Sequence, residues 1–388
     1  RVNVMLRIAF VAPFGLGKKA TVWARTLPLA RALVAKDCHA SVIIPPWDTP
    51  EDAGKAWMDE GVEVINVGLR GGLPFVVARM VGEARRLRPD IVHIVKPRAH
   101  AGLLQWLFWN FRSGSRPRLV LDVDDWEQAW APIAGYAPPM AAFLAWQEMW
   151  GYRHADGITA ASGWLVHKAR SLAPHTPCLY LPNGVAPTEA QALHRPRAFD
   201  PGRPRTVLWF TRFVEVEPEW MAACWQALHA LDPDLHLLVA GAPLQPGRDH
   251  AFRRAMGRDD PSITWLGYVP SDALPDLYAR SDCAIFPAAS TPLNLAKCSV
   301  KVATTLLAGT PVVASAVGEQ ARYGAGGAAR LVDAEASPAA FARAVIEHLA
   351  RPEERLRQVK IAREQLLTRY NWSRLTTDLL TFYRLLAG

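Results

Sequence analysis

The stretch Asn294-Leu-Ala-Lys297-Cys-Ser299-Val-Lys301-Val-Ala-Thr304-Thr-Leu-Leu-Ala-Gly309-Thr-Pro311-Val-Val-Ala314 contains one complete helix-to-strand unit. Ser299 is suited to cap a helix over 300–308, Gly309 to end it, and an apolar strand follows. Lys297 and Lys301 are four residues apart, so they share a face if the helix reaches back that far. Free amides at a helix start beside ammonium groups favour an anion such as phosphate. The alternative is a solvated lysine pair on a core helix.

The same alternation of short β-branched runs and amphipathic segments extends over the whole chain. We predict strands at 7–12, 40–44, 62–67, 90–95, 119–123, 157–160, 178–181, 206–210, 235–240, 263–266, 282–286, 311–315 and 329–332. We predict helices at about 22–36, 74–88, 99–111, 139–154, 163–172, 217–230, 272–280, 300–308, 338–350, 353–368 and 372–387. Near-continuous apolar strands separated by helices indicate parallel sheets covered on both faces. The fold class is therefore α/β, with two doubly wound domains and a proline-rich linker at 184–204.

Composition excludes several classes of protein. Of the 388 residues, 50% are hydrophobic and 21% are charged, which is incompatible with a disordered chain. The longest apolar stretch, 101–111, falls short of the ~20 residues that span a bilayer. The chain opens directly into a predicted strand, so we expect no signal peptide. Five scattered cysteines without a Cys-x-x-Cys pair argue against disulfides and zinc and favour a reducing cytoplasm.

The net charge of +8 is concentrated in residues 1–185, which hold 21 Lys and Arg against 15 Asp and Glu. Such a surplus suits phosphate-bearing ligands or an anionic membrane surface, or is simply a solvated surface. Basic runs are short and nucleic-acid-binding signatures are lacking, so we expect no nucleic-acid partner.

Glycines follow the first predicted strand, where Gly15 and Gly17 precede Lys18 and a helix. Such a loop lets the backbone approach an anion at the helix start. Its spacing matches neither a Walker P-loop nor a dinucleotide fingerprint. It indicates either ligand contact or a plain strand-to-helix turn.

Polar residues also follow later strands, and in doubly wound sheets ligands bind at these carboxyl ends. His93 lies within one strand and is either a core histidine or an acceptor-side group, whereas Lys96 lies just beyond it. Asp124 and Asp125 follow the next strand, in the acidic run Asp122–Glu127. Crowded carboxylates suit proton transfer or the binding of hydroxyls, and a helix cap or a solvated turn is the alternative. We expect no metal, because a second carboxylate cluster is lacking.

Taken together, these motifs resemble those of GT-B-fold glycosyltransferases of the family 4 type. The resemblance rests on Gly15 and Gly17, on Pro182-Asn-Gly-Val185, on Arg212, and on three further segments. Those segments are Leu266-Gly-Tyr-Val-Pro270 with Leu277 and Asp282, Phe286-Pro287, and Lys301 with Ala308-Gly-Thr-Pro-Val-Val-Ala314. The family places an acceptor domain and a donor domain on either side of a cleft. Here these domains correspond to 6–185, with the helix 371–388 crossing back, and to 204–370.

The resemblance implies a nucleotide-sugar donor, transfer with retention, and no metal or other cofactor. Donor-binding residues would be Gly15, Gly17, Lys18, Arg212, Lys297, Ser299, Lys301 and Thr304. Catalytic residues would be Asp124 and Asp125, with His93, Lys96 and Asp124 on the acceptor side. The chain departs from the family where Ala296 and Thr304 replace two glutamates and Glu217 replaces a lysine.

We therefore expect a glycosyltransferase acting on a glycan, lipid-linked or small-molecule acceptor, as in polysaccharide biosynthesis. The departures leave two alternatives: an impaired subunit that supports a partner enzyme, and a related chemistry such as nucleotide-sugar epimerisation. The expected location is cytoplasmic. Peripheral contact with the inner membrane face is an alternative, suggested by Trp106, Phe108, Trp109 and Phe111 beside Arg112, Arg116 and Arg118. These aromatics would otherwise cover the sheet as an ordinary core helix.

Overall fold

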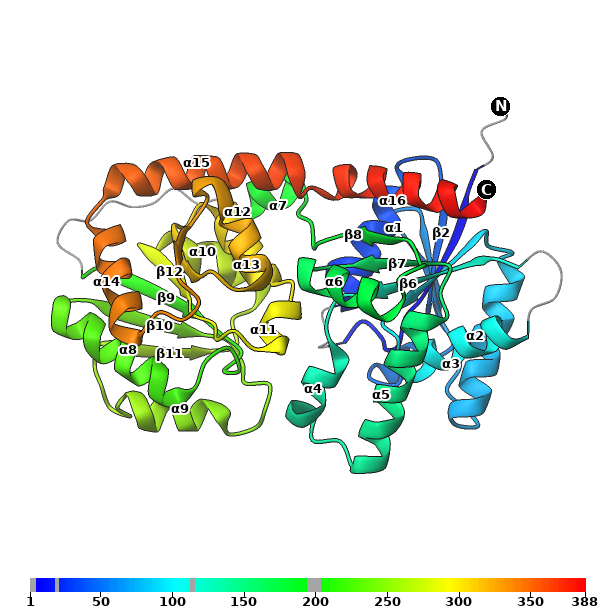
Figure 1. Cartoon of the computed structure of the whole chain (residues 1–388), viewed down its shortest axis with the longest axis horizontal. Coiled ribbons are helices and arrows are strands. Elements are labelled where there is room, and N and C mark those ends of the chain that lie inside the picture. Colours follow the sequence, from blue (N-terminus) through cyan, green and yellow to red (C-terminus); the bar gives the residue numbers. More distant parts are fainter. Residues whose placement is uncertain (1–4, 18–20, 112–115, 194–203) are drawn as a thin grey trace. The chain divides into compact units, whose positions relative to one another are not determined.

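The computed structural model describes residues 5–17, 21–111, 116–193 and 204–388. It divides the chain into two compact units. Unit 1 comprises Arg1–Asn183 with Trp372–Gly388, and unit 2 comprises Gly184–Asn371. Each unit contains one β-sheet with helices on both faces (Figure 1). Lys18 and Arg112 lie outside the described residues.

The sheet of unit 1 has eight strands in the order β3-β4-β2-β1-β5-β6-β7-β8. Its strands are β1 (Arg7–Val11), β2 (His39–Ile44), β3 (Ala56–Asp59), β4 (Val62–Asn66), β5 (Ile91–Val95), β6 (Arg118–Val123), β7 (Gly157–Ala160) and β8 (Cys178–Tyr180). All neighbours are parallel except β3, which pairs antiparallel with β4 at the edge. Because β1, β5 and β6 are adjacent and parallel, the loops after them emerge at one edge of the sheet.

Helices cover both faces of this sheet (Figure 1). They are α1 (Leu27–Val34, preceded by a helical turn at Val22–Thr26), α2 (Leu73–Arg86), α3 (Ala99–Asn110), α4 (Glu127–Ala134), α5 (Pro138–Arg153), α6 (Gly163–Leu172) and α16 (Trp372–Ala387). α5 packs on the face to which Leu121 of β6 points, since a Cβ at Gly151 would meet that side chain. The next residue, Asp122, points to the opposite face, as the alternation of a strand requires.

The sheet of unit 2 has six parallel strands in the order β11-β10-β9-β12-β13-β14. They are β9 (Thr206–Phe210), β10 (His236–Ala240), β11 (Ile263–Gly267), β12 (Cys283–Phe286), β13 (Val312–Ser315) and β14 (Arg330–Val332). The helices are α7 (Pro187–Leu193), α8 (Pro218–Leu231), α9 (Arg248–Met256), α10 (Leu274–Ala279), α11 (Pro292–Ala296), α12 (Val300–Ala308), α13 (Gly318–Tyr323), α14 (Pro338–Leu349) and α15 (Pro352–Arg369).

One face of this sheet packs on α8, α9 and α14. Their buried side chains include Trp225, Phe252 and Phe341, which belong to one core cluster with Trp209 of the central strand β9. α12 contributes buried Val302 and Leu306 on its own inner side. The strands are therefore buried on both faces, which explains why their sequences are nearly continuous apolar runs.

The predicted α/β class with two parallel-sheet domains is confirmed. Three details differ from the sequence prediction. β3 is an added antiparallel edge strand, and α7 lies inside the segment predicted to be a linker without regular structure. The short helices α4, α9, α11 and α13 were also missed, because five to nine residues carry little helical periodicity.

Within the described residues, none of the helices is both long enough and apolar enough to cross a bilayer.

Candidate functional site

Unit 2 contains a pocket beyond the carboxyl ends of its central strands. It encloses about 460 Å³, part of it open to solvent. Its walls are formed by Trp209, Phe210, Glu215, Phe286, Pro287, Ala288, Asn294, Lys297, Ser299, Lys301, Val317 and Gln320. The predicted donor-binding residues Lys297, Ser299 and Lys301 are thus brought together around one space.

Ser299 precedes α12 at the N-cap position, but its side chain makes no capping hydrogen bond. The first four main-chain N–H groups of a helix have no partners inside the helix. The pocket therefore meets the amide end of α12, the end of a helix that attracts an anion.

The ammonium group of Lys301 is anchored on the loop that follows β9. Its Nζ donates to the main-chain oxygen of Thr211 at 2.8 Å and lies 4.4 Å from the centre of the Phe210 ring. Gly241 permits this arrangement: it has φ +123°, and a Cβ there would lie 1.9 Å from the same Thr211 oxygen. Burial, together with Lys297 and Arg212, holds the pKa of Lys301 well below its usual value despite nearby Glu215. An entering anion would relieve this repulsion between cations.

Glu215 is the residue of this site that the sequence reasoning missed. Its Oε1 accepts from Lys297 Nζ at 2.8 Å. Burial disfavours its charge, but Lys297, Lys301 and the hydroxyl of Thr211 together hold the pKa of Glu215 well below its ordinary value. The carboxylate is therefore ionised among the cations. Its position in an irregular loop carried no periodic signal that would have singled it out.

The other predicted donor residues of unit 2, Arg212 and Thr304, are not among the residues that line the pocket. Arg212 makes no ion pair with a described residue, and burial lowers its pKa despite nearby Glu215. Thr304 lies one turn after Lys301, but its hydroxyl is 3.2 Å from the Lys301 oxygen and 3.2 Å from Tyr278 Oη. Thr304 is not among the residues that line the pocket.

The glycine loop of unit 1 packs against the chain itself. The amide of Gly15 donates to Asp48 Oδ1 at 2.6 Å. A Cβ at Gly15 would lie 2.3 Å from Thr49 Oγ1, and Gly17 packs against the same two residues. Close internal packing is thus sufficient to require glycine here, and the donor-binding role of Gly15, Gly17 and Lys18 stays a prediction.

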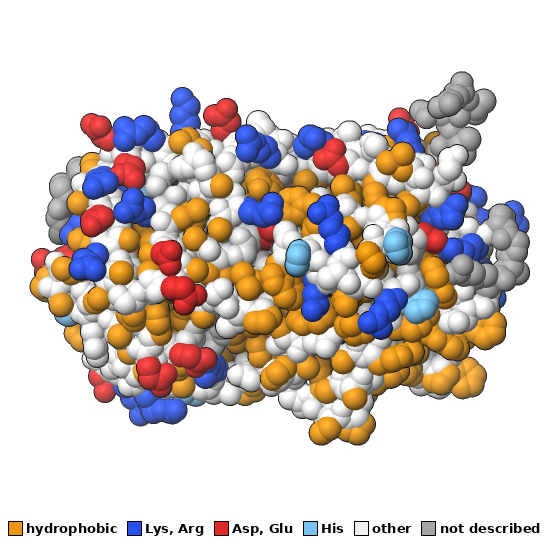
Figure 2. All heavy atoms as spheres, viewed as in Figure 1, with side chains coloured by type: hydrophobic (Ala, Val, Ile, Leu, Met, Phe, Trp, Pro, Cys, Tyr) orange, Lys and Arg blue, Asp and Glu red, His pale blue; other side chains and the backbone are white. Residues whose placement is uncertain are grey.

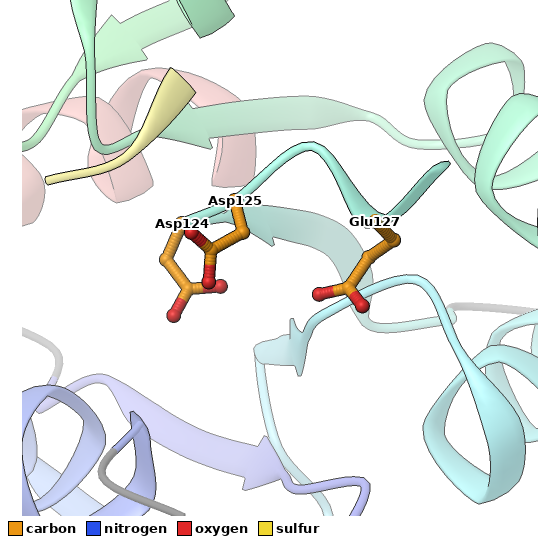
Figure 3. A group of neighbouring side chains, drawn as sticks. All are labelled: Asp124, Asp125 and Glu127. Atoms are coloured by element: carbon orange, nitrogen blue, oxygen red, sulfur yellow. The ribbon is translucent and has the colours of Figure 1, made fainter. Parts of the chain in front are cut away.

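The second group of predicted site residues lies in unit 1, around Lys96. Its Nζ is 2.8 Å from Asp124 Oδ1, 3.0 Å from Asp125 Oδ2 and 2.9 Å from Glu127 Oε1. Figure 3 shows the three carboxylates on the turn that links β6 to α4, with Asp124 and Asp125 side by side. Lys96 comes from the adjacent strand end and has φ +63°, a conformation uncommon for a residue with a side chain.

The charges of this cluster are strongly coupled. Burial would lower the pKa of Lys96, but the three carboxylates raise it well above its usual value. Burial raises the pKa of Asp124 to about 6, reinforced by Asp125 and opposed by Lys96. Burial also acts on Glu127, but Lys96 and Arg98 hold its pKa below the ordinary value. Asp124 is therefore the member that changes charge near neutral pH, and its Oδ2 also accepts from Thr21 Oγ1 at 3.1 Å.

The oxygens of Asp124, Asp125 and Glu127 lie within 4.8 Å of one another, a spacing at which carboxylates can share a metal ion. The Lys96 ammonium lies within 3.0 Å of one oxygen from each of them. It compensates part of the negative charge of the three carboxylates, and the absence of a metal stays a prediction.

His93 lies in a buried polar network on the face of the unit 1 sheet to which Asp122 points, opposite the face covered by α5. It is fully buried, and its Nδ1 is 2.6 Å from the hydroxyl of Tyr383 on α16. Beside it, Arg25 donates to both oxygens of Asp122 at 2.7 Å, and Thr159 donates to the same carboxylate. His93 is thus buried in a network that fastens α16 to the sheet of unit 1, and its acceptor-side role stays a prediction.

Glu148 of α5 is a further buried carboxylate that sequence reasoning missed. It accepts from the main-chain N–H groups of Glu127 at 2.8 Å and Gln128 at 3.1 Å, at the start of α4. Burial raises the pKa of Glu148 to about 7, with a smaller contribution from Glu127. Glu148 thereby holds the helix that positions Glu127 against Lys96.

Family models match both units. The one described as "Glycosyl transferase 4-like domain" matches residues 20–184, and the one described as "Glycosyl transferases group 1" matches residues 204–351. A search of curated protein sequences finds no match.

Solved structures share the fold over the full chain. Sucrose-phosphate synthase from Thermosynechococcus elongatus is 17% identical with a TM-score of 0.74, covering 98% of this chain and 99% of that one. A glycosyltransferase from Rickettsia africae is 14% identical with a TM-score of 0.69, covering 99% of each chain. Anabaena HepE, solved in complex with UDP-glucose, is 15% identical with a TM-score of 0.66, covering 98% of this chain and 99% of that one.

Proposed function

Since the chain belongs to the GT-B glycosyltransferases of the group 1 and 4-like type, we propose that it transfers a sugar from a nucleotide-sugar donor to an acceptor hydroxyl. The pocket of unit 2 holds the diphosphate of the donor. The observation that carries this proposal is the convergence of Lys297, Lys301 and the amide end of α12 on one pocket. HepE, of the same fold, was solved with UDP and with UDP-glucose, which supports a uridine donor as the first to be tested.

The chemical role of this pocket is to stabilise the leaving diphosphate. As the sugar-phosphate bond breaks, the acceptor oxygen bonds to the sugar and negative charge develops on the departing phosphate oxygen, which takes the acceptor proton in our proposal. Fixed cations and amide dipoles stabilise that charge without reorganising during the reaction. Lys301, Lys297 and Arg212 supply this stabilisation in our proposal, which requires no metal. Retention of configuration is the part of the proposal that rests on the family resemblance alone.

On the acceptor side, we assign contact with the acceptor and the reacting sugar to Asp124 and Asp125. With its pKa raised to about 6, Asp124 is largely ionised at neutral pH and can accept a hydrogen bond from a sugar hydroxyl. Lys96 keeps both carboxylates in place.

A lipid-linked acceptor is the finer form of this proposal. Exposed apolar side chains lie on α5, where Met140 and Trp146 are 48% and 46% exposed, and after α3, where Phe111 is 62% exposed. Figure 2 shows hydrophobic side chains gathered over this part of unit 1. Amphipathic aromatics beside a basic surface suit a membrane interface. If the protein co-sediments with anionic but not with neutral vesicles, and Trp146→Ser abolishes this co-sedimentation, the lipid-linked form is supported. If the protein stays in the supernatant to the same extent with both kinds of vesicle, that form is contradicted.

A second candidate is a nucleotide-binding subunit without transferase activity. It is favoured by Thr304, whose hydroxyl faces Tyr278 rather than the pocket, and by Glu217, which pairs with Arg248 at 2.6 Å. These two positions lack the glutamate and the lysine that the family resemblance implies, so the donor contacts are reduced.

The test is release of free nucleotide from a panel of UDP-, GDP- and ADP-sugars, combined with Lys301→Met. Loss of a charge-assisted contact costs about 1.5–3 kcal/mol, so we expect kcat/KM for the preferred donor to fall about ten- to a hundredfold. Lys360→Met on the exposed side of α15 is the matched control. Donor binding without turnover selects the second candidate. If the protein neither binds nor hydrolyses any nucleotide sugar of the panel, both candidate functions are overturned.

A further inference from the structure

We propose that Glu215 is a specificity-determining residue that makes the phosphate site discriminate against the free nucleoside diphosphate product relative to the nucleotide-sugar donor. This inference rests on the proposed function, because it concerns how the same pocket treats donor and product. It assigns a role to a carboxylate that lies, unexpectedly, at the centre of a cationic site.

The Glu215 carboxylate is held by both of its oxygens. Oε2 accepts from Thr211 Oγ1 at 2.9 Å and from the main-chain N–H groups of Arg212 at 3.1 Å and Val214 at 3.2 Å. Oε1 accepts from Lys297 Nζ at 2.8 Å. Four donors fix the group, so it cannot swing away when a ligand enters.

The negative charge of Glu215 lies where it interacts electrostatically with a ligand in the pocket. Glu215 forms part of the pocket wall together with Lys297 and Lys301, and it is the one carboxylate among the residues that line the pocket. Its side chain is only 16% exposed, so the interaction is weakly screened by water. The residue also keeps Lys297 directed toward the pocket rather than into solvent.

Donor and product differ in charge at the end of the diphosphate. In the nucleotide sugar the terminal phosphate is esterified and carries one negative charge. In the free nucleoside diphosphate that phosphate loses a second proton, with a pKa near 6, and gains another charge. A fixed carboxylate beside the site opposes the extra charge, so it weakens product binding more than donor binding. Glu215 therefore favours release of the product after transfer, a step that limits turnover in many enzymes.

The test compares affinities for UDP and UDP-glucose by calorimetry at pH 5.5 and pH 8, or for the GDP or ADP pair if those bind instead. In Glu215→Gln, which keeps an acceptor oxygen for the loop, we expect UDP to gain about tenfold over UDP-glucose at pH 8. The gain should be much smaller at pH 5.5, where the terminal phosphate is largely singly charged. Glu353→Gln is the matched control, because Glu353 is an exposed carboxylate in the first turn of α15 and does not line the pocket.

A merely structural role of Glu215 predicts a different pattern. In that case Glu215→Gln would weaken both ligands by the same factor at both pH values, and our inference would be overturned. Glu215→Asp keeps the charge, so its ratio of affinities should stay that of the wild type even if both affinities fall; a changed ratio also overturns it. If the wild-type protein binds none of the nucleotides, the proposed function fails instead.

Discussion

Replacing Lys96 by Met should expose how much unit 1 depends on a single buried cation. Met fills the volume of the lysine stem but removes the ammonium that lies 2.8–3.0 Å from oxygens of Asp124, Asp125 and Glu127. The substitution leaves the backbone cost at φ +63° unchanged, because both residues are unbranched. Its effect therefore reports on charge.

The expected loss follows from the burial of the cluster. Removing one partner of a buried ion pair costs about 3–5 kcal/mol, since the other charge is left uncompensated. The carboxylates can recover part of this by binding protons, and Asp124 already has its pKa raised to about 6 with Lys96 present. In the variant the folded-state pKa of Asp124 rises further above its unfolded value, so the loss of stability grows as pH increases. We expect a loss of about 3–5 kcal/mol at pH 8 and clearly less at pH 5.5.

Urea unfolding followed by tryptophan fluorescence measures this loss at both pH values. Lys55→Met is the matched control, because it removes an exposed pair with Asp52 at 3.8 Å, worth at most about 1 kcal/mol. The three freed carboxylates should also bind Mn²⁺ or Ca²⁺, which would restore stability to Lys96→Met alone. A loss equal to that of the control, or independent of pH, would refute the reasoning.

Three further predictions follow from single contacts. Because burial raises the pKa of Glu148 to about 7, its ionised form is unfavourable at pH 8, and Glu148→Gln should raise the free energy of unfolding there by about 1–3 kcal/mol. At pH 5 the same substitution should lower the free energy of unfolding by about 1 kcal/mol. Urea unfolding that shows the same sign at both pH values would contradict this. Tyr383→Phe leaves buried His93 without its 2.6 Å partner and should lower the free energy of unfolding by about 1–3 kcal/mol in urea. An unchanged free energy of unfolding would mean that this network does not stabilise α16. Gly241→Ala places a Cβ 1.9 Å from a carbonyl oxygen and should lower stability by about 3 kcal/mol or more in thermal unfolding. Gly247→Ala is the control, because Gly247 has open space around it and its substitution should cost less. Equal losses in the two variants would argue against the close approach at Gly241.

Much of the fold was predictable because the signal is local. The helix at 300–308 and the strands at 157–160 and 206–210 match the observed bounds, since each is a compact apolar pattern with clear ends. β3 could not be found in this way. It is a four-residue edge strand with alternate residues exposed, and pairing with β4, rather than its own sequence, makes it a strand.

The candidate sites were predictable only in part. The sequence singled out Lys297, Lys301 and Asp124 because charged residues beyond apolar strands are conspicuous. It did not single out Glu215, which belongs to an irregular loop, or Glu148, whose helix suggests an ordinary exposed acid. Both were found only from the burial and hydrogen bonds that other segments impose on them.

The sequence by itself determined most of the longer elements of this protein and its family, because hydrophobic periodicity and motif spacing are properties of neighbouring residues. Tertiary structure alone decided which charges meet. Lys297 and Glu215 are separated by 82 residues, and Tyr383 and His93 by 290. Parallel sheets bring distant strand ends to one edge, and a buried charge is tolerated only where a partner arrives there. The chemical state of each site residue is therefore set by contacts that the sequence does not display.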